Sequence, residues 1–194
     1  MSTTADNKVH YDLTNVHVAP LTLDLETGTV NFGAPKRLPG AISVDLAAQG
    51  DVIKLRADAM DYYKTTNNNG YSGNLNMAMV PDWFKQEYLG DTLSEKDKVL
   101  VENALAEPKP FAMLFEFLGD AARRRHVIYN CVASRVNIKG ENKTNQKEAD
   151  TESLPLTSSP LPDGNVKAST TAETPKAVYD SWNTSVWVKD TTTA

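Results

Sequence analysis

Nucleophilic or metal chemistry in this chain would have to come from one cysteine and three histidines. Cys131 could act as a nucleophile, but Val127, Tyr129 and Cys131 share one parity of a strand-like run, which predicts a buried packing thiol. A single cysteine also excludes an internal disulfide and every multi-cysteine metal site. The histidines, at positions 10, 17 and 126, have no metal-type partner three or four residues away, so we expect no metal site.

Charged clusters offer the next candidates. The carboxylates of Asp58 and Asp61 lie without a neighbouring aromatic cleft, so they indicate solvated acids rather than a glycosidase pair. Arg123, Arg124 and Arg125 could bind phosphate, because guanidinium groups pair with it bidentately. In a strand, however, consecutive side chains point to opposite faces, and a charged edge also blocks promiscuous strand pairing. We therefore favour a structural or intersubunit ion-pair role over nucleic-acid binding.

Known catalytic motifs are absent from the sequence. It contains no Gly-x-Ser-x-Gly, no phosphate-binding glycine loop before a helix, and no His-Glu-x-x-His. We expect no enzyme, no catalytic residue and no cofactor. The formal net charge of −5 argues against a protein that binds duplex DNA by neutralising its phosphates.

The length of 194 residues, with 40% hydrophobic and 23% charged residues, suits one globular domain. We expect a flexible amino-terminal arm at residues 1–10, a single β domain at residues 11–188 and a flexible end at residues 189–194. No segment has the apolar length of a membrane helix, and no signal peptide is expected at the start. The chain should therefore be made and remain in a cytoplasm before any assembly.

The clearest structural pattern is a change of period between Gly70 and Gly90. Alternation from residue 71 to 80 predicts a half-buried strand. Pro81 and Asp82 then suit the first turn of a helix, Phe84 and Tyr88 share one of its faces, and Gly90 is a natural terminator. The segment predicts a β-fold with one flanking short helix.

Other runs also predict strands. Apolar residues alternate from residue 16 to 25 on either side of Pro20, which fits a strand pair or an interrupted edge strand. Residues 41–46 and 52–56 predict a hairpin, and residues 111–117 with 123–136 predict the strongest hairpin, with a central core strand. Residues 154–157 read as an edge strand because of Pro155. A short helix is expected near Thr174 and Pro175.

Three segments lack a sustained period. Residues 57–69 are predicted to be a long loop, either a protein interface rich in tyrosine and asparagine or a disordered crossover. Residues 139–152 are predicted to be a charged loop. Residues 92–106 are ambiguous between a capped helix and a short strand, and we assign a turn plus a short strand.

The chain resembles the major tail protein (tail tube protein) family of long, non-contractile-tailed bacteriophages, the siphophages. The resemblance covers most of residues 8–185 in order, and it is carried by the segments at 69–75, 79–84, 89–90, 108–117, 125–131, 151–154, 158–160 and 177–179. Residues 1–7 and those beyond Trp187 carry none of it.

This resemblance implies a mainly β fold of two packed antiparallel sheets, a β-sandwich or barrel of tail-tube type with extended arms and loops. It further implies a structural virion protein: six copies form a ring, and rings stack into the conduit for genome ejection. The implied partners are other copies of itself, a tape-measure protein, a tail terminator and a distal tail protein. DNA would pass through the lumen without specific binding, and the subunit would bind no membrane.

Two sets of contacts are expected on this basis. Contacts between rings are expected at Asp58, Asp61, Tyr62, Tyr63, Asn67, Asn68, Asn69, Lys139 and Lys143, and intersubunit ion pairs at Arg123, Arg124 and Arg125. The alternative is a monomeric β-sandwich module that binds carbohydrate or protein, with Trp83, Trp182 or Trp187 as a stacking platform. The tryptophans do not share one strand face, which weakens that alternative.

Overall fold

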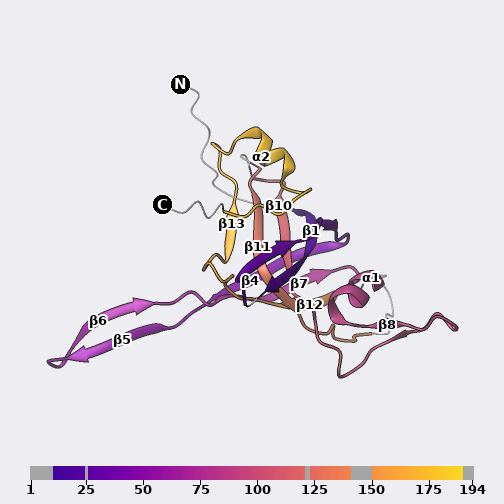
Figure 1. The fold of residues 1–194 in the computed structure, drawn as a ribbon, viewed down its shortest axis with the longest axis horizontal. Coiled ribbons are helices and arrows are strands. Elements are labelled where there is room, and N and C mark those ends of the chain that lie inside the picture. The colour runs from indigo at the N-terminus through magenta and orange to yellow at the C-terminus, as the bar shows by residue number, and fades with distance from the viewer. Residues whose placement is uncertain (1–10, 25, 121–122, 141–149, 190–194) are drawn as a thin grey trace, which may run out of the picture.

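The computed structural model describes residues 11–24, 26–120, 123–140 and 150–189, and it is mainly β with antiparallel pairing throughout (Figure 1). The elements are β1 (Leu13–Asp24), β2 (Thr29–Phe32), β3 (Lys36–Arg37), β4 (Ala41–Gln49), β5 (Val52–Ala57), β6 (Met60–Thr66), β7 (Gly70–Met77), α1 (Asp82–Phe84), a π-helical turn η1 (Lys85–Leu89), β8 (Thr92–Leu93), β9 (Leu100–Val101), β10 (Phe111–Phe117), β11 (Arg125–Ala133), β12 (Glu152–Ser158), β13 (Lys167–Ser169) and α2 (Lys176–Ser181).

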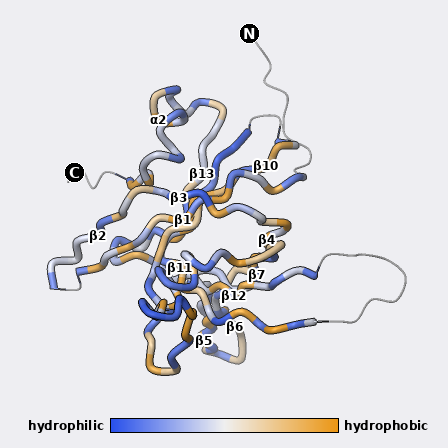
Figure 2. The backbone as a smooth tube through the Cα atoms, turned by 90° about the vertical axis from the view of Figure 1, so that its right-hand side faces the viewer, coloured by the Kyte–Doolittle hydropathy of each residue, from blue (hydrophilic) through white to orange (hydrophobic). Residues whose placement is uncertain are grey.

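The main sheet has the order β2-β1-β10-β11-β12-β7-β4, with β3 paired to β1 and β13 paired to β11. Figure 2 colours the backbone by hydropathy and shows hydrophobic and hydrophilic residues mixed along the chain. One long strand, β1, runs through Pro20: up to the proline it pairs with β10 and β3, and after it with β2. The predicted interruption at Pro20 is therefore a change of partner within one strand.

Apolar side chains fill both faces of the sheet. The first core lies under α1 and η1 and contains Val16, Val18, Leu38, Leu75, Met77, Val80, Phe84, Tyr88, Leu89, Phe111, Met113, Phe115, Ile128, Cys131, Ala133, Leu154 and Leu156. The second core lies on the other face and contains Ala19, Leu21, Ala112, Leu114, Val127, Tyr129, Leu161 and Trp182. Because both faces are covered, β10 is apolar on both sides, as predicted for a central strand.

The predicted switch from strand to helix is confirmed. β7 leads into α1 and η1, and Gly90 ends the helical segment in the left-handed conformation with φ of 80°. Phe84 and Tyr88 are buried on one face with ring centroids 4.9 Å apart. A second helix, α2, follows near the expected place, but Thr174 does not cap it: its hydroxyl oxygen accepts a hydrogen bond from the Thr171 amide.

The strongest predicted hairpin is confirmed as β10 and β11, and Cys131 on it is buried as predicted, but it lies on the other face of the sheet from Val127 and Tyr129. Val127 and Tyr129 belong to the second core, whereas Cys131 belongs to the first. Asn130 between them has φ of 46°, and the pairing of β10 with β11 shifts register nearby. This irregularity inserts a residue and turns Cys131 to the opposite face of the sheet.

Two predictions about the middle of the chain are wrong. Residues 41–56 do not form a hairpin, since β4 pairs with β7 and β5 pairs with β6. Residues 57–69 are not a long loop: most of them form the strand β6, which returns along β5 after a turn at Asp58 and Ala59. The segment lacked a clear period because this hairpin lies in the open, with no buried face to impose alternation.

The prediction of an edge strand at residues 154–157 is also wrong. β12 lies between β11 and β7. Pro155 is tolerated there because its carbonyl oxygen accepts a hydrogen bond from the Ser134 amide, just beyond the end of β11. Proline has no N–H, so it cannot donate the reciprocal hydrogen bond to Ser134, and the ladder of β11 with β12 ends at this pair.

The remaining expectations are mixed. Residues 92–106 contain the short strands β8 and β9, which pair with each other, so the predicted turn and strand were partly right. Residues 1–10 and 190–194 lie outside the described residues, and the division into one domain with two flexible ends stays a prediction. Among the described residues, no helix is long and apolar enough to cross a membrane.

Candidate functional site

The strands β5 and β6 form a hairpin that projects away from the rest of the molecule, at the lower left of Figure 1. They pair with each other and with no other described strand. The two turn residues, Asp58 and Ala59, both have positive φ, 51° and 62°, which is the geometry of a tight hairpin turn. The hairpin therefore contributes no strand to the main sheet.

Asparagines join this hairpin to the main sheet. The backbone N–H of Asn67 donates to the Asp51 carbonyl oxygen at 3.2 Å, and the backbone N–H of Asn69 donates to the Gln49 carbonyl oxygen at 2.8 Å. The Asn68 side chain accepts from the Gly70 amide at 3.1 Å. These bonds continue the strand-like pairing from β4 and β7 into β5 and β6, so they fix the direction in which the hairpin leaves the body.

The register of the hairpin gives it two different faces. Residues opposite each other on an antiparallel pair share a face, which places Ile53, Leu55, Met60 and Tyr63 together. Their exposed fractions are 52%, 58%, 61% and 56%. We call these four residues the apolar face of the hairpin. A two-stranded hairpin is marginally stable in water, so such a face calls for a covering partner.

The other face of the hairpin is charged. Lys54 and Lys64 are directly opposite each other. Asp61 lies between cations, with its carboxylate 3.3 Å from the Lys54 ammonium and 3.7 Å from the Arg56 guanidinium. These pairs are largely exposed, so each contributes little to stability. The charged side chains favour contact of this face with water. Burial in an interface would therefore stabilise the apolar face more than the charged face.

Two strand edges of the main sheet are open. β4 pairs only with β7, and β2 pairs only with β1, among the described strands. β4 spans nine residues, and Ile42 on it is 51% exposed. Open edges of this length present unpaired backbone groups that can bind another strand.

The residues predicted to contact neighbouring rings are mostly brought together by this hairpin. Asp58 lies in its turn, Asp61, Tyr62 and Tyr63 lie on β6, and residues 67–69 lie at its base. Lys139 is not part of the hairpin; it lies beyond β11 and lines a cleft with Arg135 and Glu152. Lys143 lies outside the described residues. Their role between rings stays a prediction.

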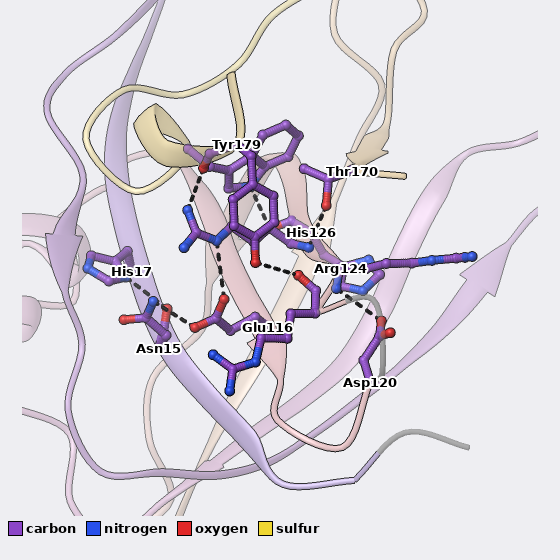
Figure 3. A network of polar contacts seen from close by, with 11 residues as sticks. Asn15, His17, Glu116, Asp120, Arg124, His126, Thr170 and Tyr179 are labelled. Atoms are coloured by element: carbon purple, nitrogen blue, oxygen red, sulfur yellow. Dashed lines mark hydrogen bonds and ion pairs between the residues drawn. The ribbon is translucent and has the colours of Figure 1, made fainter. Parts of the chain in front are cut away.

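The arginine cluster lies in a polar network within the chain (Figure 3). The Arg125 Nε is 3.2 Å from Glu116 Oε2, and its guanidinium lies 4.1 Å from the centre of the Tyr179 ring. Glu116 also accepts a hydrogen bond from the Asn15 side chain at 2.9 Å. Arg125 therefore joins β10, β11 and the segment of α2 within one copy.

The other two arginines differ from Arg125. Arg123 and Arg124 use their backbone amides to bind Asp120, and the Arg123 carbonyl oxygen accepts from the Tyr179 hydroxyl at 2.9 Å. With the described residues, neither guanidinium forms an ion pair. The proposed intersubunit ion pairs therefore depend on Arg123 and Arg124 more than on Arg125.

A second network holds the β8–β9 segment. The Arg135 guanidinium lies 2.9 Å from the Asp91 carboxylate and 3.1 Å from the Glu102 carboxylate. It also donates to the Asn103 carbonyl oxygen at 2.8 Å. Because the guanidinium donors of Arg135 are used in these bonds, Arg135 stabilises the β8–β9 segment and is not available to bind phosphate.

Among the described residues, neither a metal site nor a tryptophan platform is found. No group of three or more metal-ligating side chains occurs among the described residues. Trp182 is buried in the second core and stacks on Trp187, with ring centroids 6.1 Å apart. Trp83 lies on α1, with the Lys36 ammonium over its ring. The three tryptophans therefore do not form one stacking surface.

Cys131 is buried, as the sequence predicted, and burial raises the pKa of its thiol to about 12. Only the thiolate reacts, so native Cys131 should react with iodoacetamide at pH 8 about 1000-fold or more slowly than in the urea-unfolded chain. Mass spectrometry of the alkylated protein measures this ratio. A Lys64→Cys variant is the control, because its exposed thiol should label rapidly in the folded protein. Rapid labelling of native Cys131 would contradict its placement in the first core.

Comparison with known proteins finds similarity only to solved structures, at low sequence identity. No family model matches the chain, and no curated protein matches it. Among solved structures, it is similar to the anti-feeding prophage cap (AFP tube terminating cap), with a TM-score of 0.46, 12% identity, and coverage of 88% of this chain and 99% of that chain. It is also similar to a chain of the PVC sheath-tube complex of an extracellular contractile injection system in the extended state, with a TM-score of 0.44, 9% identity, and coverage of 84% and 93%.

Proposed function

We propose that this chain is a self-assembling structural subunit of a phage-type tail tube. The observation that carries the proposal is the projecting β5–β6 hairpin, whose apolar face is exposed in the single chain. Such a face is costly in a monomer and useful in an assembly. The resemblance of the sequence to siphophage major tail proteins supports the same function. On this proposal the protein acts in the virion tail, where it catalyses no reaction and needs no cofactor.

Ring closure would use the open edges of the main sheet. β4 at one end and β2 at the other are available to pair with strands of neighbouring copies. A closed ring removes free edges from every subunit and prevents uncontrolled edge-to-edge aggregation. We propose six copies per ring, with a tape-measure protein, a tail terminator and a distal tail protein as partners, on the basis of the resemblance.

Contacts between stacked rings would come from two segments. The first is the hairpin, with Asp58, Asp61, Tyr62 and Tyr63, together with Asn67, Asn68 and Asn69 at its base. The second is the charged stretch at residues 139–150, with Lys139 and Lys143. Arg123 and Arg124 are proposed to form ion pairs between subunits.

The charge of the chain suits a conduit for DNA. Each copy has a formal charge of −5, so a ring of copies is strongly acidic. A lumen with the same sign as the phosphate backbone would repel DNA and let it slide without specific binding. A structure of the assembled tube with a basic lumen would refute this part of the proposal.

Electron microscopy of the purified protein tests the proposal, with analytical ultracentrifugation on the same sample. Rings or tubes of uniform diameter are the expected result. A monodisperse monomer at every concentration, without rings, would overturn the proposal and favour a monomeric binding module. A buffer series from low to high salt adds a control, since assembly through apolar surface should persist when exposed ion pairs are screened.

A further inference from the structure

An apolar groove opens on the main body. Side chains from the strands β4, β7, β10, β11 and β13 line it, among them Val44, Leu46, Phe115, Phe117, Ile128 and Ala168, and its volume is about 440 Å³. Phe115 packs with His126 there, with ring centroids 5.2 Å apart and the planes nearly parallel. Aromatic and aliphatic side chains thus form the floor of a partly open surface.

The topology of the sheet explains why this groove exists. One edge of β11 is shared by two strands: residues His126 to Ile128 pair with β13, and Cys131 to Ala133 pair with β12. The irregularity at Asn130 separates the two stretches. β12, β7 and β4 therefore diverge from β13, and the apolar side chains between them are left partly uncovered.

The hairpin of the same copy is held away from this groove. It leaves the body at the base formed by residues 67–69, and it extends outward (Figure 1). One chain thus carries an exposed apolar face and, on other strands, an apolar groove. Neither surface covers the other within the copy.

We propose that the apolar face of the β5–β6 hairpin of one copy seats in the groove of a second copy. This inference rests on the proposed function, because it takes another copy of the chain as the partner. The two surfaces match in polarity, since Ile53, Leu55, Met60 and Tyr63 carry no charge. The charged face of the hairpin, with Lys54 and Lys64, then stays in solvent.

The charges of the groove and of the hairpin turn are compatible with this contact. The groove lining contains the cation Lys167 and no carboxylate, and the Lys167 ammonium lies over the Tyr71 ring at 4.9 Å. The turn of the hairpin carries the carboxylate of Asp58. A groove lined by carboxylates would have repelled that turn.

The contact is head-to-tail, because the hairpin and the groove belong to different parts of the chain. Each copy that offers a hairpin keeps its own groove free for the next copy. A head-to-tail contact adds one copy after another, so it gives either a closed ring or an open filament. The proposal therefore names an interface that can lengthen an assembly without a second kind of subunit.

Disulfide cross-linking between two variants tests the contact. One variant carries Tyr63→Cys on the apolar face, and the other, with a mass tag, carries Ala168→Cys in the groove. Oxidation of the mixture should give a mixed dimer on a non-reducing gel, and the matched control Lys64→Cys, on the charged face, should give at least tenfold less. Leu46→Cys is a second groove variant, in case Ala168→Cys does not fold. Cys131 stays in place because its thiol is buried.

The outcomes separate the two proposals. Equal cross-linking from positions 63 and 64, or none from either with folded variants, would overturn the hairpin-in-groove contact. Rings or tubes in the microscope without the 63–168 cross-link would leave the tail-tube proposal standing while this contact fails. A specific cross-link from particles that never close or stack would support this contact and count against the tail tube.

Discussion

Replacing Phe111 with alanine is expected to lower the free energy of unfolding by about 3–5 kcal/mol. Phe111 is 1% exposed and begins the central strand β10. Its ring centroid lies 5.6 Å from that of Phe84 and 4.9 Å from that of Tyr88. The truncation would remove the side chain on which the α1 and η1 segment packs, and it would leave a cavity that rigid strands on either side cannot fill.

Urea denaturation followed by far-ultraviolet circular dichroism measures this loss. Domains of ordinary stability unfold with about 5–15 kcal/mol, so the change would remove a large share of the total. Leu118→Ala is the matched control, because Leu118 follows the same strand and is 54% exposed; it should change the free energy by less than about 0.5 kcal/mol. A Phe111→Ala effect as small as that of the control would contradict the central place of β10 in the core.

The parts of the fold that the sequence predicted are those in which burial imposes a clear pattern. β10 has apolar residues on both sides because both of its faces are covered, and that continuous run was read as a core strand. The switch at Gly70 to Gly90 was read correctly because a change of period and a left-handed glycine coincide there. The ion pair of Glu116 with Arg125 was not predicted, because it depends on the register of β10 with β11, which the sequence pattern left open.

The parts that the sequence did not predict depend on contacts that leave no local pattern. The β5–β6 hairpin has no glycine in its turn, where Asp58 and Ala59 adopt positive φ, so the usual turn signal is missing. Both of its faces are exposed, and its apolar residues do not follow a single parity because of the bulge near Arg56. The apolar face of the hairpin was therefore missed, although Tyr62 and Tyr63 were picked out as exposed interface residues.

Register irregularities account for the other failures. The sequence placed Cys131 with Val127 and Tyr129, and a single positive φ at Asn130 moved it to the other core. Pro155 pointed to an edge strand, but β12 lies between β11 and β7, and the proline lies where the ladder with β11 ends, beyond the pair of Ala133 with Leu156. The groove on β4, β7, β10, β11 and β13 arises from the same irregularity, so no sequence pattern could have revealed it.

Removing the hairpin should abolish tubes and leave the subunit folded. In this variant residues 52–66 are deleted, and Asp51 is joined to Asn67 through an Asn-Gly turn, which suits a two-residue connection. The Asn67 and Asn69 amides bind the carbonyl oxygens of Asp51 and Gln49, so the base of the hairpin is already closed. Since β5 and β6 pair with no other strand in the described part of the chain, both cores keep their contacts.

Circular dichroism and thermal denaturation check the fold, and electron microscopy with sedimentation checks the assembly. We expect a melting temperature within a few degrees of the full chain and no structures longer than a single ring, because the surface proposed to join rings is gone. A Lys54→Ala and Lys64→Ala double variant is the control, since it changes the charged face and keeps the apolar face. Tubes of normal length from the deleted chain would refute a role for the hairpin between rings, whereas loss of folding would mean that it stabilises the body through contacts that its open position does not suggest.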